Sequence, residues 1–502
     1  MRKMSILRGT LLLTGANLLI RLISLVFQVF LEKHLGAAGL GLLQLISTVG
    51  VMAGTVGASG VRVAAMYLTA EEFGHRRLAG VRQAVTSCLR YGLVISCAAG
   101  AALFLLADIL AQHWLQDSRA VLSLQVMGLL LPFSCLCGIM TGYYTACARI
   151  GKLIIIEITE RLASVLLTAG LLLTWAKGDL SRACCAVVLG SSLGAALDFV
   201  LLYSGYRRDL RTELQGSAAP GMWQRLLRLC VPLALNDYLR TGLNTVEQFL
   251  IPYGLAQYGA SQEGALSVYG TIHGMVFPVL MFPAAILYAL SDLLVPELSR
   301  SRAIGAQRRI EGLTERCLGL CAGFSAAVAG LLLINGPELG QLIYGSAGAG
   351  TYLRLFAPMV LILYLDAIVD GMLKGLAEQV RCVRYNTLTS LMDVLFLFLL
   401  LPHWGIGGYV FSFVVTHAVN LYLSIRRLLQ VTEYSLSLGA LLRPVLCGLM
   451  AVLPVLLLPG QMAALPAVML RSVLFLLFFS GFLLLSRQKI SGHGVDILRR
   501  RG

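Results

Sequence analysis

Long apolar segments, separated by short polar connections, follow one another along almost the whole chain. Most are long enough to cross a bilayer as a helix, so the pattern predicts an all-α polytopic membrane protein with about fourteen spanning helices. The expected ranges are 7–31, 40–69, 84–112, 120–147, 153–176, 183–206, 229–252, 267–294, 317–335, 353–373, 386–402, 408–429, 444–459 and 465–486.

Polar residues within these segments form a weak internal repeat. The first helix matches the seventh at a common offset of 219 residues, through Asn17, Arg21, Gln28 and Phe30 against Asn236, Arg240, Glu247 and Phe249. An even number of helices separates the two copies, so both copies cross the membrane in the same direction. Parallel repeats of this kind are typical of transporters, with the binding site between the halves.

The repeat predicts two pseudo-symmetric lobes of six helices and two further helices at the C-terminal end. The N-terminal lobe is expected at 1–210, a cytoplasmic linker at 211–228 and the C-terminal lobe at 229–430. The additional pair of helices is expected at 444–486, followed by a basic cytoplasmic tail at 487–502.

Composition and charge support the membrane interpretation and fix an expected orientation. The chain is 58% hydrophobic and only 13% charged, and its net charge is +15. With the N-terminus inside, 29 of the 40 Lys and Arg residues fall in inner segments and 4 in outer ones. This asymmetry predicts that both termini are cytoplasmic, in a protein of the cell membrane. It also explains the positive charge without a nucleic-acid partner.

Signatures of an enzyme are missing from the sequence. It has no P-loop, no HExxH, no GxSxG and no GxGxxG that follows a strand. The 12 cysteines form no CxxC pair and lie mostly in apolar segments, as small buried residues do. We therefore expect no catalytic residue, metal or cofactor.

Arginines inside the apolar segments are the first candidates for function. A charge near the bilayer centre costs at least ~3 kcal/mol, so Arg21 and Arg62 need a partner on another helix or on a ligand. Arg240 has Asp237 and Glu247 on its own helix, and local neutralisation is its structural alternative. The candidate cavity residues are Arg21, Arg62, Arg240, Gln28, Glu247 and His273. Guanidinium groups bind phosphate bidentately, so a lipid-borne pyrophosphate would fit them.

Carboxylates form a second group of candidates. Glu157 and Arg161 are four residues apart on one predicted helix, which favours a structural or gating ion pair. Asp366, Asp370 and Asp393 lie on the tenth and eleventh expected helices with Asn386 nearby, and carboxylates there could bind Na⁺ or carry protons. Asp237, Asn386 and Asp393 are weaker candidates for binding this coupling cation.

Several stretches resemble stage V sporulation protein B and its relatives in the multidrug/oligosaccharidyl-lipid/polysaccharide exporter superfamily. They are RGTLLLTGANLLIRLISLVFQVFLEKHLGAAGLGLLQL (8–45), YYTACARIGKLIIIEITER (143–161), MVFPVLMFPAAILYALSDLLVPELSRSRA (275–303), GLAEQVRCVRYNT (375–387) and LLPHWGIGGYVFSFVV (400–415). The resemblance implies fourteen helices, an alternately opening V-shaped cavity and a lipid-linked cell-wall or polysaccharide precursor as cargo. It places basic cavity residues at Arg21 and Arg62. On the eighth helix, this chain has His273 where a lipid II flippase would have arginine.

The function expected from these features is that of a flippase for an undecaprenyl-pyrophosphate-linked saccharide, serving peptidoglycan synthesis during spore formation. The partners would be that lipid-linked saccharide, the bilayer, and Na⁺ or H⁺. Two alternatives stay open. A drug/cation antiporter of the MATE type would need cavity carboxylates rather than arginines. A non-transporting scaffold for cell-wall synthesis would not need its cavity arginines at all.

Overall fold

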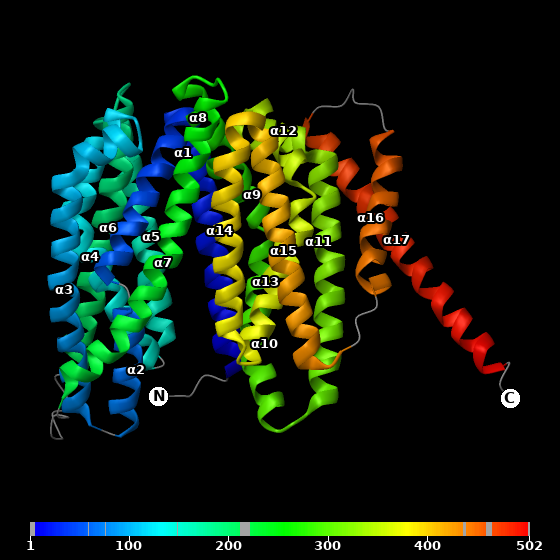
Figure 1. Ribbon diagram of the computed structural model, residues 1–502, viewed down its shortest axis with the longest axis horizontal. Coiled ribbons are helices and arrows are strands. Elements are labelled where there is room, and N and C mark those ends of the chain that lie inside the picture. Colours follow the sequence, from blue (N-terminus) through cyan, green and yellow to red (C-terminus); the bar gives the residue numbers. More distant parts are fainter. Residues whose placement is uncertain are drawn as a thin grey trace. The chain divides into compact units, whose positions relative to one another are not determined.

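A computed structural model describes residues 6–58, 60–75, 77–147, 149–210, 221–434, 438–457 and 464–499. The described residues form helices and short connections and no strand, which confirms the all-α prediction. The chain divides into two compact units, Met1–Gly270 and Thr271–Gly502. Figure 1 shows the order of the helices within each unit.

In the part of the chain that the structure describes, the first unit contains eight α-helices. They are α1 (Ile6–Ala58), α2 (Val61–Gly74), α3 (Leu78–Ile109), α4 (Val121–Ala146), α5 (Ile150–Thr174), α6 (Leu180–Leu210), α7 (Met222–Gln257) and α8 (Gln262–Tyr269), with the short turns η1 (Leu110–Trp114) and η2 (Ser118–Ala120) between α3 and α4.

The second unit follows a π-helical stretch, η3 (Gly270–Val276), that begins at the boundary. Its helices are α9 (Phe277–Met281), α10 (Ala284–Ala303), α11 (Gln307–Tyr344), α12 (Ala347–Phe356), α13 (Met359–Gly375), α14 (Gln379–Trp404), α15 (Ile406–Thr432), α16 (Leu438–Leu456) and α17 (Ala464–Arg499).

The expected number of fourteen spanning helices stays a prediction. Among the described residues, nine helices are long and apolar enough to cross a membrane, or ten if the bent pair α12–α13 is one span. The first two expected spans lie in one helical stretch that continues into α2. Helices α5 and α7 are long enough but carry several charged residues. Helices α8, η3 and α9 together form one candidate span, Gln262–Met281, which ends inside the expected eighth span.

Glycine and proline explain where the expected helices break. Gly36 interrupts α1 with φ 67° and ψ 177°, a conformation that favours glycine because it has no Cβ. Pro283 precedes α10, and Pro358 lies at the 58° bend between α12 and α13. Proline cannot donate the backbone hydrogen bond that would continue the preceding helix.

The expected lobe boundaries also remain predictions, with one difference to report. Helix α7, which the repeat assigns to the C-terminal lobe, packs against α1, α2 and α3 and belongs to the first compact unit. Of the expected linker, 211–220 lies outside the described residues, and α7 begins at Met222. The expected tail at 487–502 begins inside α17, while 500–502 lie outside the described residues.

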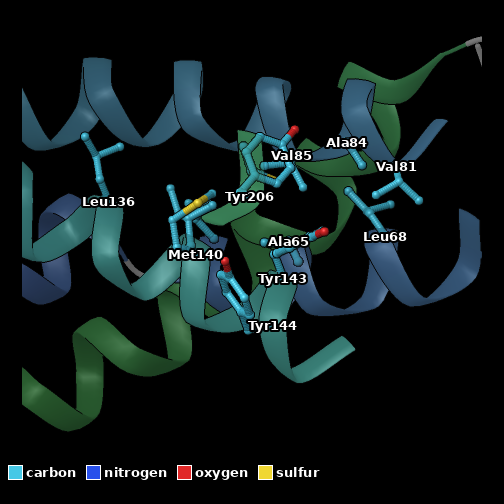
Figure 2. Packing of buried hydrophobic residues seen from close by; sticks show 14 of the residues in the cluster. Ala65, Leu68, Val81, Ala84, Val85, Leu136, Met140, Tyr143, Tyr144 and Tyr206 are labelled. Carbon is cyan, nitrogen blue, oxygen red and sulfur yellow. The ribbon is translucent and has the colours of Figure 1, made fainter. Parts of the chain in front are cut away.

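A tyrosine-rich core holds the first unit together (Figure 2). Tyr143 and Tyr206 meet edge to face with ring centroids 4.9 Å apart, a favourable arrangement of aromatic rings. Tyr144 is fully buried, and its hydroxyl donates to the carbonyl oxygen of Leu202 at 3.0 Å. These contacts join α4 to α6 and satisfy a hydroxyl group that would otherwise be costly to bury.

Helix α2 packs on α4 at almost the closest distance that two backbones allow. A Cβ atom at Gly142 would lie 2.5 Å from the carbonyl oxygen of Arg62. One turn earlier, a Cβ atom at Gly138 would lie 3.9 Å from the nearest atom, the Cβ of Arg62. Gly142 therefore sets the distance between the two helices, as small residues do at helix contacts in membranes.

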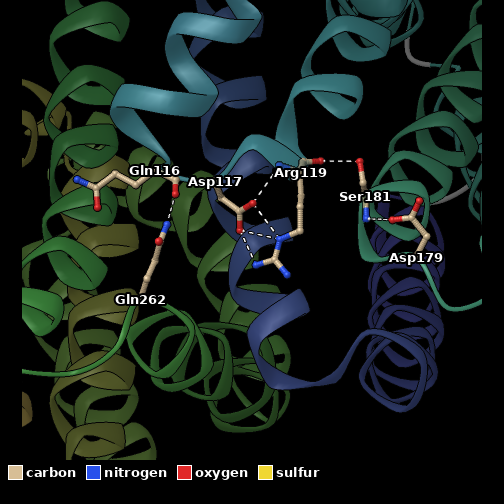
Figure 3. A network of polar contacts seen from close by, with 6 residues as sticks. All are labelled: Gln116, Asp117, Arg119, Asp179, Ser181 and Gln262. Atoms are coloured by element: carbon tan, nitrogen blue, oxygen red, sulfur yellow. Dashed lines mark hydrogen bonds and ion pairs between the residues drawn. The ribbon is translucent and has the colours of Figure 1, made fainter.

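A polar network ties the α3–α4 connection to its neighbours (Figure 3). The buried carboxylate of Asp117 accepts from Arg119 Nη2 at 2.7 Å, and Ser181 Oγ donates to the Arg119 carbonyl oxygen at 2.9 Å. Gln262 Nε2 donates to the carbonyl oxygen of Gln116. The network links this connection to the first residues of both α6 and α8.

In the second unit, α16 and α17 pack on each other and on α11. Phe475 of α17 is fully buried, and a Cβ atom at Gly330 of α11 would lie 2.2 Å from its ring. Helix α17 therefore packs on α11 through a specific aromatic contact.

A bidentate ion pair joins the α13–α14 connection to α15. Arg427 donates to Glu378 through Nη2 at 2.7 Å and through Nε at 3.0 Å, and the two side chains are only 18% and 12% exposed. The hydrogen bonds from Arg427 hold the pKa of Glu378 below its usual range. Parallel hydrogen bonds between guanidinium and carboxylate are among the strongest polar contacts in proteins.

We predict that Gly142→Ala destabilises the protein by about 1–3 kcal/mol, because the new methyl group meets a backbone atom that cannot move alone. Gly138→Ala is the matched control on the same helix and should cost much less. The measurement is the midpoint of thermal unfolding in detergent micelles. Equal midpoints for the two variants would contradict the close contact.

We predict that Glu378→Gln lowers stability by about 1–3 kcal/mol at neutral pH. A lowered pKa in the folded state means that the stabilisation is present above the unfolded-state pKa and is lost as pH falls through the folded-state value. The difference between wild type and variant should therefore begin to shrink as the pH falls below about 4, the ordinary range of a glutamate, and should disappear only below the lowered folded-state pKa. A difference that persists in acid would show that Glu378 acts through packing rather than charge.

Candidate functional site

A cavity of about 330 Å³ lies within the first unit, among α1, α2, α4 and α7. Small and polar residues make up most of its lining: Val51, Gly54, Thr55, Ala58, Gly60, Arg62, Val63, Ser134, Cys135, Gly138, Asp237, Arg240 and Thr241. Two predicted cavity residues, Arg62 and Arg240, thus face the same space, together with Asp237.

Local backbone geometry positions Arg62. Gly60, with φ 72°, precedes α2, and a Cβ atom there would lie 2.6 Å from the carbonyl oxygen of Cys230 on α7. The start of α2 is thereby held against α7 on one side and against Gly142 of α4 on the other. Arg62 is the second residue of α2, and its side chain is exposed.

Helix α7 brings Arg240 and Asp237 to the cavity together, because residues three apart share one face of a helix. The hydroxyl groups of Thr55 and Thr241 lie 3.3 Å apart, and Tyr238 Oη donates to the carbonyl oxygen of Val56 at 3.4 Å. These contacts between α1 and α7 border the cavity and add hydroxyl groups to it.

Among the described residues, no ion pair neutralises the cationic charge in this cavity. Neither Arg62 nor Arg240 forms an ion pair with a residue that the structure describes. Asp237 takes part in an interaction of its own. Two guanidinium groups that share one cavity with hydroxyl donors form a suitable environment for an anion.

The expected contact between Glu157 and Arg161 is absent from the described residues. The charges that act on Glu157 are those of Asp198 on α6 and Arg62 on α2. Arg161 Nε is buried and has no hydrogen-bond partner in the described part of the chain. Spacing along α5 permits the pair, but the neighbouring helices supply other charges. The gating role stays a prediction.

The remaining cavity candidates of the first unit lie elsewhere on α1 and α7. Arg21 and Glu247 are half-buried, and each takes part in an interaction. Gln28 is half-buried too, and its Nε2 has no hydrogen-bond partner among the described residues. None of the three lines the cavity that holds Arg62 and Arg240.

His273 lies in the π-helical stretch η3, within the second unit. Its Nε2 is 3.2 Å from the hydroxyl group of Tyr409, and its ring packs against Phe277 with centroids 5.1 Å apart. Phe356 and Phe413 complete an aromatic cluster around these residues. The structure therefore shows His273 in an aromatic environment, and its role in cargo binding stays a prediction.

The cation candidates do not form one cluster within the second unit. Asp393 is buried and accepts from Ser412 Oγ and from Thr416 Oγ1, the latter at 3.3 Å. Asn386 is exposed on the same helix, and Asp237 belongs to the first unit. Among the described residues, no group of three His, Cys, Asp or Glu side chains could hold a metal ion.

Two polar residues with charged or hydrogen-bonded partners were not predicted from the sequence, Asp198 and Asn420. The charge of Asp198, on α6, acts on Glu157. Asn420 Nδ2 donates to both carboxylate oxygens of Asp366, each at 3.1 Å. The signal for Asn420 was present in the sequence, since polar residues recur every fourth position at Ser412, Thr416, Asn420 and Ser424.

Comparison with known proteins agrees with the fold and with the resemblance seen in the sequence. Residues 6–301 match the family model described as "Polysaccharide biosynthesis protein". The chain is 22% identical over 463 residues to stage V sporulation protein B of Bacillus subtilis (strain 168), covering 89% of each protein. The predicted resemblance to that protein is confirmed.

Two solved structures illustrate the fold. The lipid II flippase MurJ in an inward closed conformation is 11% identical, with a TM-score of 0.74, and the match covers 96% of this chain and 99% of that one. An inward-facing MATE family transporter of the MOP superfamily is 15% identical, with a TM-score of 0.61 and coverage of 84% and 100%. The chain therefore belongs to the polysaccharide biosynthesis protein family and has the helical fold of MOP-superfamily transporters.

Proposed function

We propose that this protein moves a lipid-linked saccharide with a pyrophosphate head group across the cell membrane by alternating access. The observation that carries the proposal is the cavity shared by Arg62 and Arg240, two exposed arginines without ion-pair partners among the described residues. An intramembrane cation is costly, and an anionic cargo would offset that cost during transport.

The chemistry of the cavity suits pyrophosphate better than a neutral sugar. Each guanidinium group offers a fork of N–H donors that matches two phosphate oxygens. The hydroxyl groups of Thr55, Thr241 and Ser134 add donors around the same space. The polyprenyl tail would stay in the hydrocarbon while the arginines bind the head group, so no covalent step is required.

Relatives support a narrower proposal for the cargo. One relative is named for stage V of sporulation, and a structural neighbour is named as a lipid II flippase. We propose an undecaprenyl-pyrophosphate-linked precursor of peptidoglycan, used for the spore cortex. Arg21 and His273 would contact the cargo at other stages of its passage.

A MATE-type antiporter is the second candidate, and Asp237 is the feature that favours it. A carboxylate in the cavity could bind a cationic drug, which Arg62 and Arg240 would repel. Because two arginines and only one aspartate line the cavity, its charge matches an anionic cargo better than a cationic one. A scaffold that does not transport would have no use for either charge.

We predict that Arg62→Gln and Arg240→Gln each reduce cargo transport about tenfold or more, because each removes charged hydrogen bonds worth roughly 1.5–3 kcal/mol. Arg62→Lys should retain part of the activity, since it keeps the charge and loses the fork. The assay follows a fluorescent polyprenyl-pyrophosphate saccharide in proteoliposomes, beside a cationic dye.

Arg90→Gln is the control, because Arg90 is an exposed arginine on α3 that does not line the cavity. Full transport by the double variant Arg62→Gln/Arg240→Gln at normal abundance would refute the proposal. Transport of the dye alone, dependent on Asp237, would favour the antiporter. Unchanged cell-wall synthesis in cells that carry the double variant would favour the scaffold.

The orientation is a separate prediction, with both termini in the cytoplasm. Single cysteines at Tyr258 and Ala347 should react with an impermeant thiol reagent in intact cells, whereas a cysteine at Ile304 should not. All three positions are exposed, and Ile304 avoids the φ of +66° at Gly305. The background must lack native cysteines such as the exposed Cys97. Labelling at Ile304 in intact cells would reverse the orientation.

A further inference from the structure

A polar stripe runs along one face of α15 in the second unit. Ser412, Thr416, Asn420 and Ser424 are only 0%, 2%, 8% and 3% exposed, and their spacing of four residues places them on one side of the helix. Polar side chains buried in a membrane protein commonly mark an ion or proton pathway. The side chains that hydrogen-bond to this stripe are therefore candidates for binding an ion or a proton.

Two carboxylates from neighbouring helices meet the stripe. Asp393 of α14 accepts from Ser412 and Thr416, and Asp366 of α13 accepts twice from Asn420. In both cases the carboxylate is held by hydrogen-bond donors of α15. No arginine or lysine forms an ion pair with either aspartate among the described residues.

Asn420 leaves one strong acceptor unused. Its Nδ2 donates to Asp366, while its Oδ1 is buried and has no hydrogen-bond partner in the described residues. The side chain as a whole is more than nine-tenths buried, so solvent does not satisfy this oxygen. A buried amide oxygen is normally satisfied by a hydrogen-bond donor, and protonation of Asp366 would provide an O–H donor beside it.

Other titratable groups around α13 are few. Asp370 and Lys374 act on Asp366 from the same helix, and they pair with each other at 2.7 Å. Cys382 of α14 lies against Asp370, and His417 of α15 lies within reach of the Asp393 charge. Helices α10 and α11 contribute Tyr288 and Cys321, both near Tyr364 of α13.

We propose that Asp366 and Asn420 form a proton-binding site, and that a proton is the ion coupled to transport. When Asp366 is ionised, the Asn420 amide donates to it, as the structure shows. When Asp366 takes a proton from water, its O–H donates to Asn420 Oδ1 after the amide rotates. Release on the other side of the membrane returns the pair to its first arrangement. Only one O–H bond forms and breaks.

The donors at these carboxylates favour a proton over a metal cation. Hard cations are held by several oxygen atoms that direct lone pairs at the ion. Here the nearest groups direct N–H and O–H bonds at the aspartates instead. Coupling to transport rests on the proposed function, whereas proton binding at Asp366 does not.

The first test needs no transport. Infrared spectra of the purified full-length protein in vesicles, taken from about pH 8 to about pH 5, report protonated carboxyl groups. The difference spectrum between wild type and Asp366→Asn should show one carboxyl band. The position of that band should shift in Asn420→Leu, which removes the Asn420 Oδ1 acceptor. Asp292→Asn, a control at an exposed aspartate of α10, should leave the band in place.

Two infrared results would overturn the site: no band that depends on Asp366, or an unchanged band position in Asn420→Leu. If Asp366→Asn does not accumulate, the shift in Asn420→Leu decides alone. In proteoliposomes, a proton gradient should accelerate wild-type transport, and Asp366→Asn should lose that acceleration.

Transport and infrared results separate the two proposals. Transport that follows a Na⁺ gradient and ignores pH would overturn proton coupling and leave the flippase proposal intact. A carboxyl band at Asp366 in a protein that moves no cargo would support the proton site and contradict the flippase proposal.

Discussion

The cost of placing charge in an apolar medium is the constraint that organises this protein. A membrane offers no water to ionised side chains, so each charge must be neutralised within the protein, reach an interface or face an aqueous cavity. Several described charges follow the first route. Arg225 pairs with the buried Glu72 at 2.8 Å, and Arg471 pairs with Glu338 at 2.5 Å. Such pairs fix where α7 meets α2 and where α17 meets α11.

Charged groups that form no ion pair with a described residue are therefore the candidates for function. In the first unit, Arg62 and Arg240 direct positive charge at one cavity, and small residues of α4 leave room beside them. In the second unit, Asp366 and Asp393 are held by neutral donors of a single helix. One unit thus presents cations to a space, and the other buries carboxylates among hydroxyl and amide groups.

Much of the fold could be predicted from the sequence, because apolar length and helical period report directly on membrane-spanning helices. The bounds of α4 and α6 lie within a few residues of the expected ones. Prediction failed where backbone conformation intervened, as at η3, whose π-helical turns have no signature in hydropathy. Arg62 and Arg240 were found because charge in an apolar segment is conspicuous. The environments of Glu157 and His273 could not be predicted, because helices far apart in the sequence supply their neighbours.

Gly142 has a consequence for how such a site evolves. Its missing side chain fixes the backbone of α2 at Arg62, so the height of the guanidinium group in the cavity depends on a residue that does not line that cavity. A larger residue at position 142 would push α2 away from α4 and move Arg62 with it. The position of Arg62 can therefore change through the packing of α2 on α4 while every cavity side chain keeps its identity. Two proteins with identical cavity residues therefore need not have cavities of the same shape.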